Sequence, residues 1–401
     1  MSIFQINSCN VGSTGGIMLS IARAARLAGL SVTTCCAYSR TNLPKCDEYS
    51  LLIGNRFSRN VHLFAGIFLG ISNCMSFFST LFFLRKIKKQ HCTIIHLHNL
   101  HNCYINLPLL FHFIKKHHIS IIWTLHDCWA FTGRCPHFVM MKCDDWKTCC
   151  HNCHFPKKSY PQSYVDVTRM MWKLKRKWFT GIENCTIVTP SQWLADLVKQ
   201  SYLKDYPVKV INNGIDLSVF KPTKSNFCKK QGLTGKKIVL GVAFGWGVRK
   251  GLDVFIELSR RLSDDYRIIL VGTDDKIDKL LPSNIISIHR TKNQRELAEI
   301  YTVADVFANP TREEVLGLVN VESLACGTPV VTFKTGGSPE CIDETCGSVV
   351  DCDDIDAMEF EIRRICEENP YSSDACLKRA KKFDMNERFE EYVELYKEIC
   401  K

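Results

Sequence analysis

Two glutamates near residue 320 have the chemistry to bind sugar hydroxyl groups. Glu314 and Glu322 are separated by seven residues and flank Gly317. A carboxylate accepts two hydrogen bonds from neighbouring hydroxyl groups, so Glu322 could hold a ribose and Glu314 a second sugar. The alternative is a solvated amphipathic helix, in which acidic residues are common near the start. The runs ACGTPVV and GGSPE that follow favour the binding site over this alternative.

A helix that begins near Leu316 would add an anion site beside these carboxylates. Its first turn would present the backbone N–H groups of Gly317, Leu318 and Val319, and the positive end of the helix dipole, to a diphosphate. A diphosphate between two sugar sites matches a nucleotide diphosphate sugar. The sequence therefore predicts a donor site here.

Two cationic side chains, Arg249 and Lys250, could bind the diphosphate at this site. Arg249 and Lys250 follow the apolar run KIVLGVAF and the turn GWG. Cations at the end of a strand can neutralise the charge that grows on a departing diphosphate. We therefore expect both side chains to bind the donor.

Polar or flexible residues also follow apolar runs in the first half of the chain. Gly15 and Gly16, within GSTGG, would let backbone N–H groups approach a phosphate or a sugar. A merely tight turn between a strand and a helix explains the same two glycines equally well. His126 follows the run IIWTL and precedes Asp127. A lone histidine of this kind is more often structural than functional.

Cysteines gather in residues 134–155, which read RCPHFVMMKCDDWKTCCHNCHF. Four thiolates there could close a tetrahedral zinc site, with a Cys-x-x-Cys pair as its knuckle. These four are Cys135, Cys143, Cys150 and Cys153. Because four protein ligands leave no position for water, such a zinc would be structural and not catalytic. The competing ligands nearby are Cys149, His137, His151 and His154. A reduced, metal-free loop and a disulfide are the other interpretations.

Short apolar runs alternate with longer amphipathic segments along the whole chain. The runs in the first half are IFQIN, SVTTCCAY, TIIHLH, SIIWTLHD and CTIVTP, and those in the second are KIVLGVAF, YRIILVG, IISIH, VFANP and PVVTF. This pattern predicts the α/β class, with parallel sheets covered by helices on both faces. Ligands bind at the carboxyl ends of such strands, which is where the residues above are expected to lie.

The chain is long enough for two domains of this kind. Its 401 residues are more than one domain with a single hydrophobic core usually contains. A polar run that includes Gly214 and Pro222 interrupts the alternation of apolar and amphipathic segments. We place an N-terminal, acceptor-side domain in residues 1–215 and a nucleotide-sugar-binding domain in residues 216–385. A final helix is expected in residues 386–401.

Several motifs together resemble those of glycosyltransferase family 4, the retaining enzymes of GT-B fold, in which seven residues separate two glutamates. Within this family, the chain resembles most the bacterial polysaccharide glycosyltransferases of the colanic-acid and O-antigen type. The motifs are HLHNLHNCYINLPLL at His96, WTLHDCWAFTGRC at Trp123, VTPSQWLADLVKQS at Val188, VINNGID at Val210 and VRKGLDVF at Val248.

The resemblance implies a fold and roles for single residues. It implies two Rossmann-like, doubly wound domains that face a cleft, with the last helix returning to the first domain. His126 would face the reacting sugar, with Glu314 as the second catalytic residue. The loop GWGVRKG matches the family at Lys250 but lacks the arginine that some members place further upstream. No cofactor would be required for catalysis, and no Asp-x-Asp pair stands in a suitable loop.

The two halves of the chain differ in charge. Residues 1–216 hold 25 Lys and Arg against ten Asp and Glu, a net charge of +15, whereas the remaining residues hold 27 against 31, a net charge of −4. A basic half suits an anionic bilayer, a phosphorylated acceptor or nucleic acid, and a solvated basic surface is the simplest alternative. Its basic runs lie beside large apolar residues, which favours a membrane surface over nucleic acid.

The start of the chain and one long uncharged segment bear on location. The chain opens MSIFQINSCN, without a signal-peptide pattern, so we expect its 22 cysteines to be reduced in the cytoplasm. Residues 64–84 carry no charge, which is long enough to span a bilayer. Serines, an asparagine and a threonine interrupt the segment. We therefore expect a buried or interfacial helix that ends in the basic residues 85–89.

The resemblance to glycosyltransferase family 4, taken together with these observations, implies a retaining glycosyltransferase on the inner face of the cell membrane. Its donor would be a nucleotide diphosphate sugar, of UDP or GDP, and its acceptor a polyprenyl-linked cell-surface oligosaccharide. A phosphorylase of the same fold is one alternative. A nicotinamide-dependent dehydrogenase is disfavoured because GSTGG lacks the G-x-G-x-x-G spacing. A zinc-containing, basic nucleic-acid-binding protein would explain the cysteines but not Glu314 and Glu322.

Overall fold

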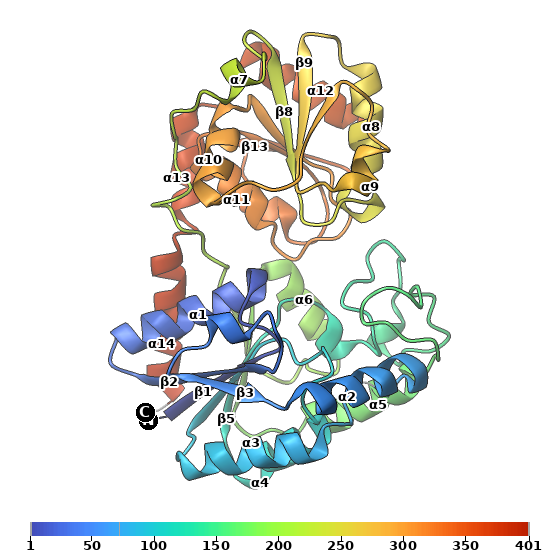
Figure 1. Ribbon diagram of the computed structural model, residues 1–401, viewed down its shortest axis with the longest axis vertical. Coiled ribbons are helices and arrows are strands. Elements are labelled where there is room, and N and C mark those ends of the chain that lie inside the picture. The colour runs from blue at the N-terminus through green and yellow to red at the C-terminus, as the bar shows by residue number, and fades with distance from the viewer. Residues whose placement is uncertain (1, 72, 400–401) are drawn as a thin grey trace. The chain divides into compact units, whose positions relative to one another are not determined.

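The computed structural model describes residues 2–71 and 73–399, which form two compact units (Figure 1). Unit 1 comprises residues up to Ile211 together with the chain from Phe389 onward, and unit 2 comprises Asn212–Arg388. The expected boundaries, after residues 215 and 385, lie within four residues of these.

Unit 1 is built on a seven-stranded parallel sheet of order β3-β2-β1-β4-β5-β6-β7. Its strands are β1 (Ser2–Asn7), β2 (Ser31–Ala37), β3 (Ser50–Ile53), β4 (Ile94–Leu97), β5 (Ser120–Thr124), β6 (Cys185–Thr189) and β7 (Val208–Val210). Its helices are α1 (Gly12–Leu27), α2 (Arg56–Leu69), α3 (Phe77–Lys89), α4 (Leu107–Lys116), α5 (Thr168–Phe179) and α6 (Gln192–Gln200). Every residue of β4 is buried, as expected for a strand covered on both faces.

Unit 2 repeats this architecture with a six-stranded parallel sheet of order β10-β9-β8-β11-β12-β13. Its strands are β8 (Lys237–Val242), β9 (Tyr266–Val271), β10 (Ile285–Ile288), β11 (Val306–Asn309), β12 (Val330–Phe333) and β13 (Gly347–Val350). Its helices are α7 (Phe227–Lys230), α8 (Leu252–Arg261), α9 (Asp275–Asp278), α10 (Gln294–Val303), α11 (Leu318–Ala325), α12 (Ile355–Glu368) and α13 (Ser373–Lys381). The α/β class with two doubly wound sheets is confirmed.

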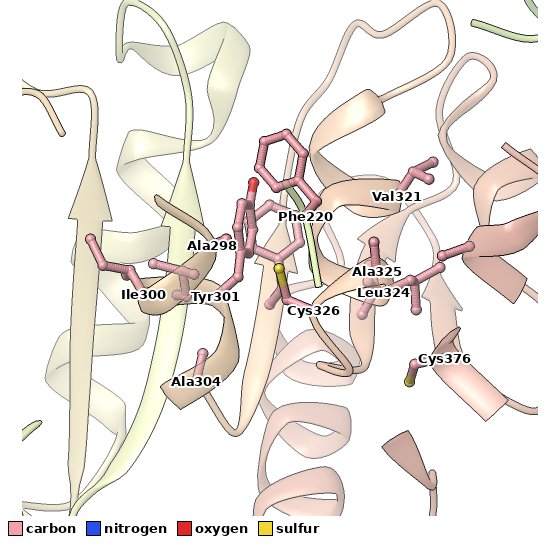
Figure 2. Close-up of a cluster of buried hydrophobic side chains, with 14 of the residues drawn as sticks. Phe220, Ala298, Ile300, Tyr301, Ala304, Val321, Leu324, Ala325, Cys326 and Cys376 are labelled. Carbon is pink, nitrogen blue, oxygen red and sulfur yellow. The ribbon is translucent and has the colours of Figure 1, made fainter. Parts of the chain in front are cut away.

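A cluster of apolar side chains fixes α10 and α11 beside the sheet of unit 2 (Figure 2). Tyr301 of α10, Leu324 of α11 and Phe307 of β11 are all fully buried in it. Deleting a buried side chain of this size costs about 2–5 kcal/mol. The cluster therefore holds α11, and with it Glu322, in a fixed position on the sheet.

The last helix, α14 (Met385–Ile399), packs into unit 1 from Phe389 onward. Its Tyr396 hydroxyl lies 2.6 Å from Nδ1 of His96 in β4 and accepts a hydrogen bond of 2.9 Å from Gln5 in β1. The Tyr392 hydroxyl accepts a bond of 3.2 Å from Thr124 in β5. Because all these groups are buried, the sheet and the helix give each other hydrogen-bond partners that water cannot supply.

The structure divides the uncharged segment 64–84, which was expected to form a single helix. α2 ends at Leu69, and Gly70 follows in a left-handed conformation with φ of 68°. α3 begins seven residues later and does end in the expected basic residues, at Lys89. Neither piece is long: among the described residues, no helix combines the length and the apolar character needed to cross a bilayer.

Candidate functional site

The strongest candidate site in unit 2 lies where its sheet reverses strand order. β8 and β11 are neighbours in the sheet, and the chain leaves them in opposite directions along it. Lys250 lies in a short 3-10 turn, Val248–Lys250, after β8, and Glu314 lies in the loop after β11. Such a switch point is where open α/β sheets bind ligands.

Lys250 and Glu314 form an ion pair at this point. The Lys250 ammonium donates to Oε2 of Glu314 at 2.6 Å, and both side chains are about one-fifth exposed. Oε1 of Glu314 accepts from the backbone N–H of Val315 at 3.1 Å. The sequence predicted both residues in the donor site but not that they pair.

Arg312, which the sequence analysis missed, fixes the loop that carries Glu314. Its guanidinium binds both carboxylate oxygens of Asp253, at 2.8 and 2.7 Å, and Asp353 at 2.6 Å. The hydrogen bonds that Arg312 donates to Asp253, opposed by partial burial, raise the pKa of Arg312 above its usual range. Its backbone N–H donates to the carbonyl of Arg249 at 3.0 Å. The loops after β8 and β11 are thereby held together.

The helix expected beside the glutamates is α11, which begins at Leu318 and not near Leu316. Gly317 caps it with φ of 87°, a conformation that suits glycine, and Val319 follows in its first turn. A Cβ at Gly317 would lie 3.3 Å from Cγ of Glu314, so the helix start and this carboxylate are close neighbours. The structure thus places Gly317, and with it the start of α11, beside Glu314. Arg249 lies with Lys250 in the 3-10 turn after β8.

Glu322 lies further along α11, as the sequence indicated. The Tyr301 hydroxyl donates to its Oε2 at 3.1 Å. Burial raises the pKa of Glu322 to about 7, although the Tyr301 bond opposes that shift. About half of the Glu322 carboxyl groups are thus ionised near neutral pH. A further hydrogen-bond donor, such as a hydroxyl group, would favour the ionised form.

In unit 1, His126 lies just beyond β5 and pairs with His98, just beyond β4. Nε2 of His126 is 3.0 Å from Nδ1 of His98, and the two rings are stacked. Burial lowers the pKa of His126 to about 4, so its imidazole is neutral at pH 7. A neutral imidazole can exchange a hydrogen bond with a hydroxyl group without bringing a charge to it.

A second series of hydrogen-bonded side chains, which no sequence motif had indicated, ends at Asp127, the residue after His126. The Tyr160 hydroxyl is 2.6 Å from Nδ1 of His101, and Nε2 of His101 is 2.9 Å from Asp127. Burial alone would raise the pKa of Asp127, but bonds from His101 and the backbone N–H of Trp129 lower it to about 2. The position of Asp127 directly after His126 was the one available sequence signal.

Gly15 and Gly16 differ from the expected loop. Both lie inside α1, which begins at Gly12. A Cβ at Gly15 would lie 2.5 Å from the backbone carbon of Asn10, so this glycine serves close packing. Nothing lies within 4 Å of a Cβ built on Gly16, which is exposed. Close packing, which was not among the sequence-based interpretations, thus accounts for Gly15.

Three buried polar atoms near this edge of unit 1 have no hydrogen-bond partner among the described residues. They are Nδ2 of Asn7, Oδ1 of Asn10 and Nε2 of His98. Asn7 ends β1, and Asn10 and His98 follow β1 and β4, which are the neighbours at the switch point of this sheet. Because unpaired buried polar atoms are costly, such a group indicates a site that hydroxyl groups of a ligand can complete.

The four cysteines of the predicted zinc site line one cavity of about 40 Å³, together with His151 and His154. The backbone N–H of Gly133 donates to Sγ of Cys150 at 3.1 Å. Among the described residues, no three of these ligand atoms lie within 4.8 Å of one another, and these four cysteines are free thiols. The residues share a cavity but are not in ligand geometry, so the metal site stays a prediction.

The one group in the described chain that does meet this distance is Asp275, Asp278 and His289. All three are exposed, and Asp278 bonds to His289 at 2.7 Å. This arrangement is accounted for by a surface ion pair.

Two family models match the chain. Residues 17–219 match "Glycosyltransferase Family 4", and residues 224–383 match "Glycosyl transferases group 1". The first covers just over half of the chain.

Curated relatives and solved structures agree with these matches. The chain is 25% identical over 269 residues to a putative colanic acid biosynthesis glycosyl transferase, WcaC, of Escherichia coli K12, a match that spans 65% of each protein. It is 32% identical over 166 residues to a GDP-mannose-dependent phosphatidylinositol monomannoside mannosyltransferase of Mycolicibacterium smegmatis, across 36% of the chain and 43% of that protein. The chain thus spans less than two thirds of these relatives' length.

The fold itself is shared over the full length. A sucrose-phosphate synthase of Thermosynechococcus elongatus aligns with a TM-score of 0.74 at 17% identity, over 100% of this chain and 99% of that one. Anabaena HepE, solved in complex with UDP, aligns with a TM-score of 0.69 at 15% identity, over 99% and 100%.

Proposed function

The chain belongs to glycosyltransferase family 4, and on that premise we propose that it moves a sugar, with retention of configuration, from a nucleotide diphosphate sugar to a hydroxyl of a lipid-linked oligosaccharide. The observation that carries this proposal is the Lys250–Glu314 ion pair beside the start of α11, at the switch point of unit 2. A cation and a helix start lie there next to a carboxylate, and these groups could bind the phosphates and a sugar hydroxyl of the donor respectively.

The donor's phosphates would bind at Lys250 and the N–H groups of Gly317, Leu318 and Val319. When the bond between the anomeric carbon and the phosphate oxygen breaks, negative charge grows on that oxygen. A fixed ammonium and a helix start stabilise this charge without reorganisation, which lowers the barrier. The proposal needs no divalent metal because these groups supply the positive charge.

Retention follows if the acceptor attacks from the face that the phosphate leaves. The acceptor oxygen then forms the new bond to the anomeric carbon, and its proton passes to the departing phosphate oxygen. Glu314 would accept hydrogen bonds from the donor sugar, and Glu322 from the ribose.

The edge of unit 1 would supply contacts to sugar hydroxyl groups. Neutral His126 is suited to this, and the unpartnered atoms of Asn7, Asn10 and His98 have unused hydrogen-bonding capacity. A polar, saccharide-like ligand fits these groups better than an apolar one.

Both UDP and GDP remain candidates for the nucleotide. Anabaena HepE is solved with UDP and UDP-glucose, whereas the mycobacterial relative is named GDP-mannose-dependent. The relative named for colanic acid biosynthesis supports a polysaccharide as the product. We place its assembly at the inner face of the cell membrane as part of the same proposal.

Calorimetric titration with UDP, GDP, ADP and their sugar conjugates tests the proposal. We expect one of these nucleotides to bind. The Glu322→Ala substitution should lower the affinity for the sugar conjugate of that nucleotide about tenfold or more, which is the usual cost of a lost hydrogen bond to a charged group. Glu344→Ala, an exposed glutamate of the same unit, is the matched control. Equal affinity in Glu322→Ala and wild type would contradict the ribose contact.

A further inference from the structure

Helix α2 of unit 1 has its apolar side facing solvent. Phe57, Val61, Phe64 and Phe68 recur every three to four residues, so they share one face of the helix, and they are 78, 40, 60 and 48% exposed. The buried side of the same helix carries His62, Ala65 and Gly66. This is the reverse of the usual amphipathic pattern, in which large apolar residues face the core.

The neighbouring helix α3 continues this surface. Phe77, Phe78 and Phe82 are 51, 72 and 64% exposed, while Phe83 of the same helix is buried in the core. Serine hydroxyls join the two helices: Ser58 of α2 bonds to Ser79 of α3 at 3.0 Å. The aromatic face of the two helices comprises Phe57, Val61, Phe64, Phe68, Phe77, Phe78 and Phe82.

The last two turns of α3 change from aromatic to basic. An open hollow of about 690 Å³ is lined by the Phe82 ring and by four cations. These are Arg85, Lys86, Lys88 and Lys89. The Arg85 guanidinium lies over the Phe82 ring at 6.0 Å. An apolar side chain and a phosphate group could therefore bind side by side here.

No acidic residue offsets this charge in the surrounding sequence. Between Glu48 and Asp127 the chain has no Asp or Glu, but it has eight Lys and Arg. A surface with exposed phenylalanines and unopposed cations is complementary to the anionic headgroups and acyl chains of a lipid leaflet.

We propose that the aromatic face of α2 and α3 docks the enzyme on an anionic bilayer, with the basic end of α3 on lipid headgroup phosphates. The rings would enter the boundary between headgroups and acyl chains, and neither helix would span the membrane. This extends the proposed function, since a lipid-linked acceptor would lie at that surface.

A second copy of the chain fits the same face less well. Neither α2 nor α3 contains an acidic residue, so two copies that meet there would leave the basic ends of both α3 helices without a neutralising partner. Anionic lipid neutralises these cations instead. The bilayer is therefore the occupant that both the aromatic and the basic parts favour.

Vesicle sedimentation tests this inference with the purified full chain and without substrates. We compare vesicles of phosphatidylcholine with vesicles that contain about 30 mol% phosphatidylglycerol, an anionic surface. Wild type is expected to sediment with the anionic vesicles, and less so as salt is raised. We expect F64S/F68S and K86Q/K89Q each to lower the partition coefficient roughly tenfold, from lost apolar burial and lost charge respectively.

The matched control is Phe360→Ser, which removes a phenylalanine of unit 2 that is 64% exposed, and it should bind vesicles as wild type does. Absence of binding to anionic vesicles, or equal binding by all variants, overturns the proposal. So does a change from dimer to monomer in F64S/F68S without a change in vesicle binding. Failure here is distinguishable from failure of the sugar-transfer proposal, because donor titration in solution does not involve this face.

Discussion

Glu322 is the residue whose surroundings bear most directly on how a donor would bind. Its pKa of about 7 means that a part of the molecules holds a proton on this carboxyl at neutral pH. A protonated carboxyl cannot accept hydrogen bonds from both hydroxyls of a ribose through two oxygens. Only the ionised fraction is therefore competent in the proposed contact.

From this we predict that donor affinity rises with pH between about 6 and 8. The apparent affinity scales with the competent fraction, so a sugar conjugate should bind about tenfold more weakly at pH 6 than at pH 8. A nucleotide diphosphate sugar is the right probe because its diester phosphates do not titrate in this range. Calorimetry at several pH values measures the slope.

Glu322→Gln provides the control for this pH dependence. Its affinity should be lower at pH 8 and nearly independent of pH, because the amide does not titrate. A slope that persists in Glu322→Gln would assign the titration to another group.

At this scale the sequence predicted residue types better than contacts. Glu314 and Glu322 could be selected because of their spacing, and Lys250 because it follows an apolar run. Arg312 and His101 could not, because their partners Asp253 and Asp127 are 59 and 26 residues away in the chain. Contacts of this kind depend on which strands become neighbours, which one sequence does not specify.

Among the elements, the segment between β3 and β4 shows where sequence patterns were insufficient. Its uncharged length suggested one helix over residues 64–84, because hydropathy records how apolar a segment is and not where it turns. The turn depends on Gly70 in a left-handed conformation, packed against Val165 and Val167. Those residues come from a loop almost a hundred positions later.

The cysteine-rich insertion is an element whose stability should depend on a metal. We propose that it binds zinc through Cys135, Cys143, Cys150 and Cys153, which already line one cavity. Metal analysis of freshly purified protein should find about one zinc per chain, and a C150S/C153S variant should contain none, because two of four ligands are lost.

A control for the zinc prediction is Cys352→Ser, an exposed thiol in unit 2, which should retain the metal. Zinc-free wild-type protein with a folded insertion would refute the metal site. It would favour the reduced, metal-free loop.

For the molecule as a whole, the return of α14 makes both ends of the chain part of unit 1. Deleting residues 389–399 and the two that follow would leave buried groups of Gln5, His96 and Thr124 without their tyrosine partners. Each unsatisfied buried group costs about 1–3 kcal/mol. We predict that unit 1 loses its cooperative unfolding transition in this variant. Differential scanning calorimetry measures that transition.

The same truncated variant offers an internal comparison. Unit 2 keeps its own cores, so its unfolding transition and the nucleotide binding that we propose for it should persist. A smaller change, Tyr396→Phe, should lower the unfolding temperature of unit 1 alone. Loss of both transitions together would show that the units do not fold independently.

The two points where the chain enters and leaves unit 2 are themselves hydrogen-bonded. Ile215 pairs with Asp384 in an isolated parallel bridge, with bonds of 2.9 Å from Ile215 to the Phe383 carbonyl and 3.0 Å from Met385 to the Ile215 carbonyl. Residues 212–388 therefore form a cassette with adjacent ends, inserted into a unit that is otherwise continuous. Such a cassette can be exchanged between proteins without stretching its host, which gives a natural route by which one host unit could acquire a different inserted unit.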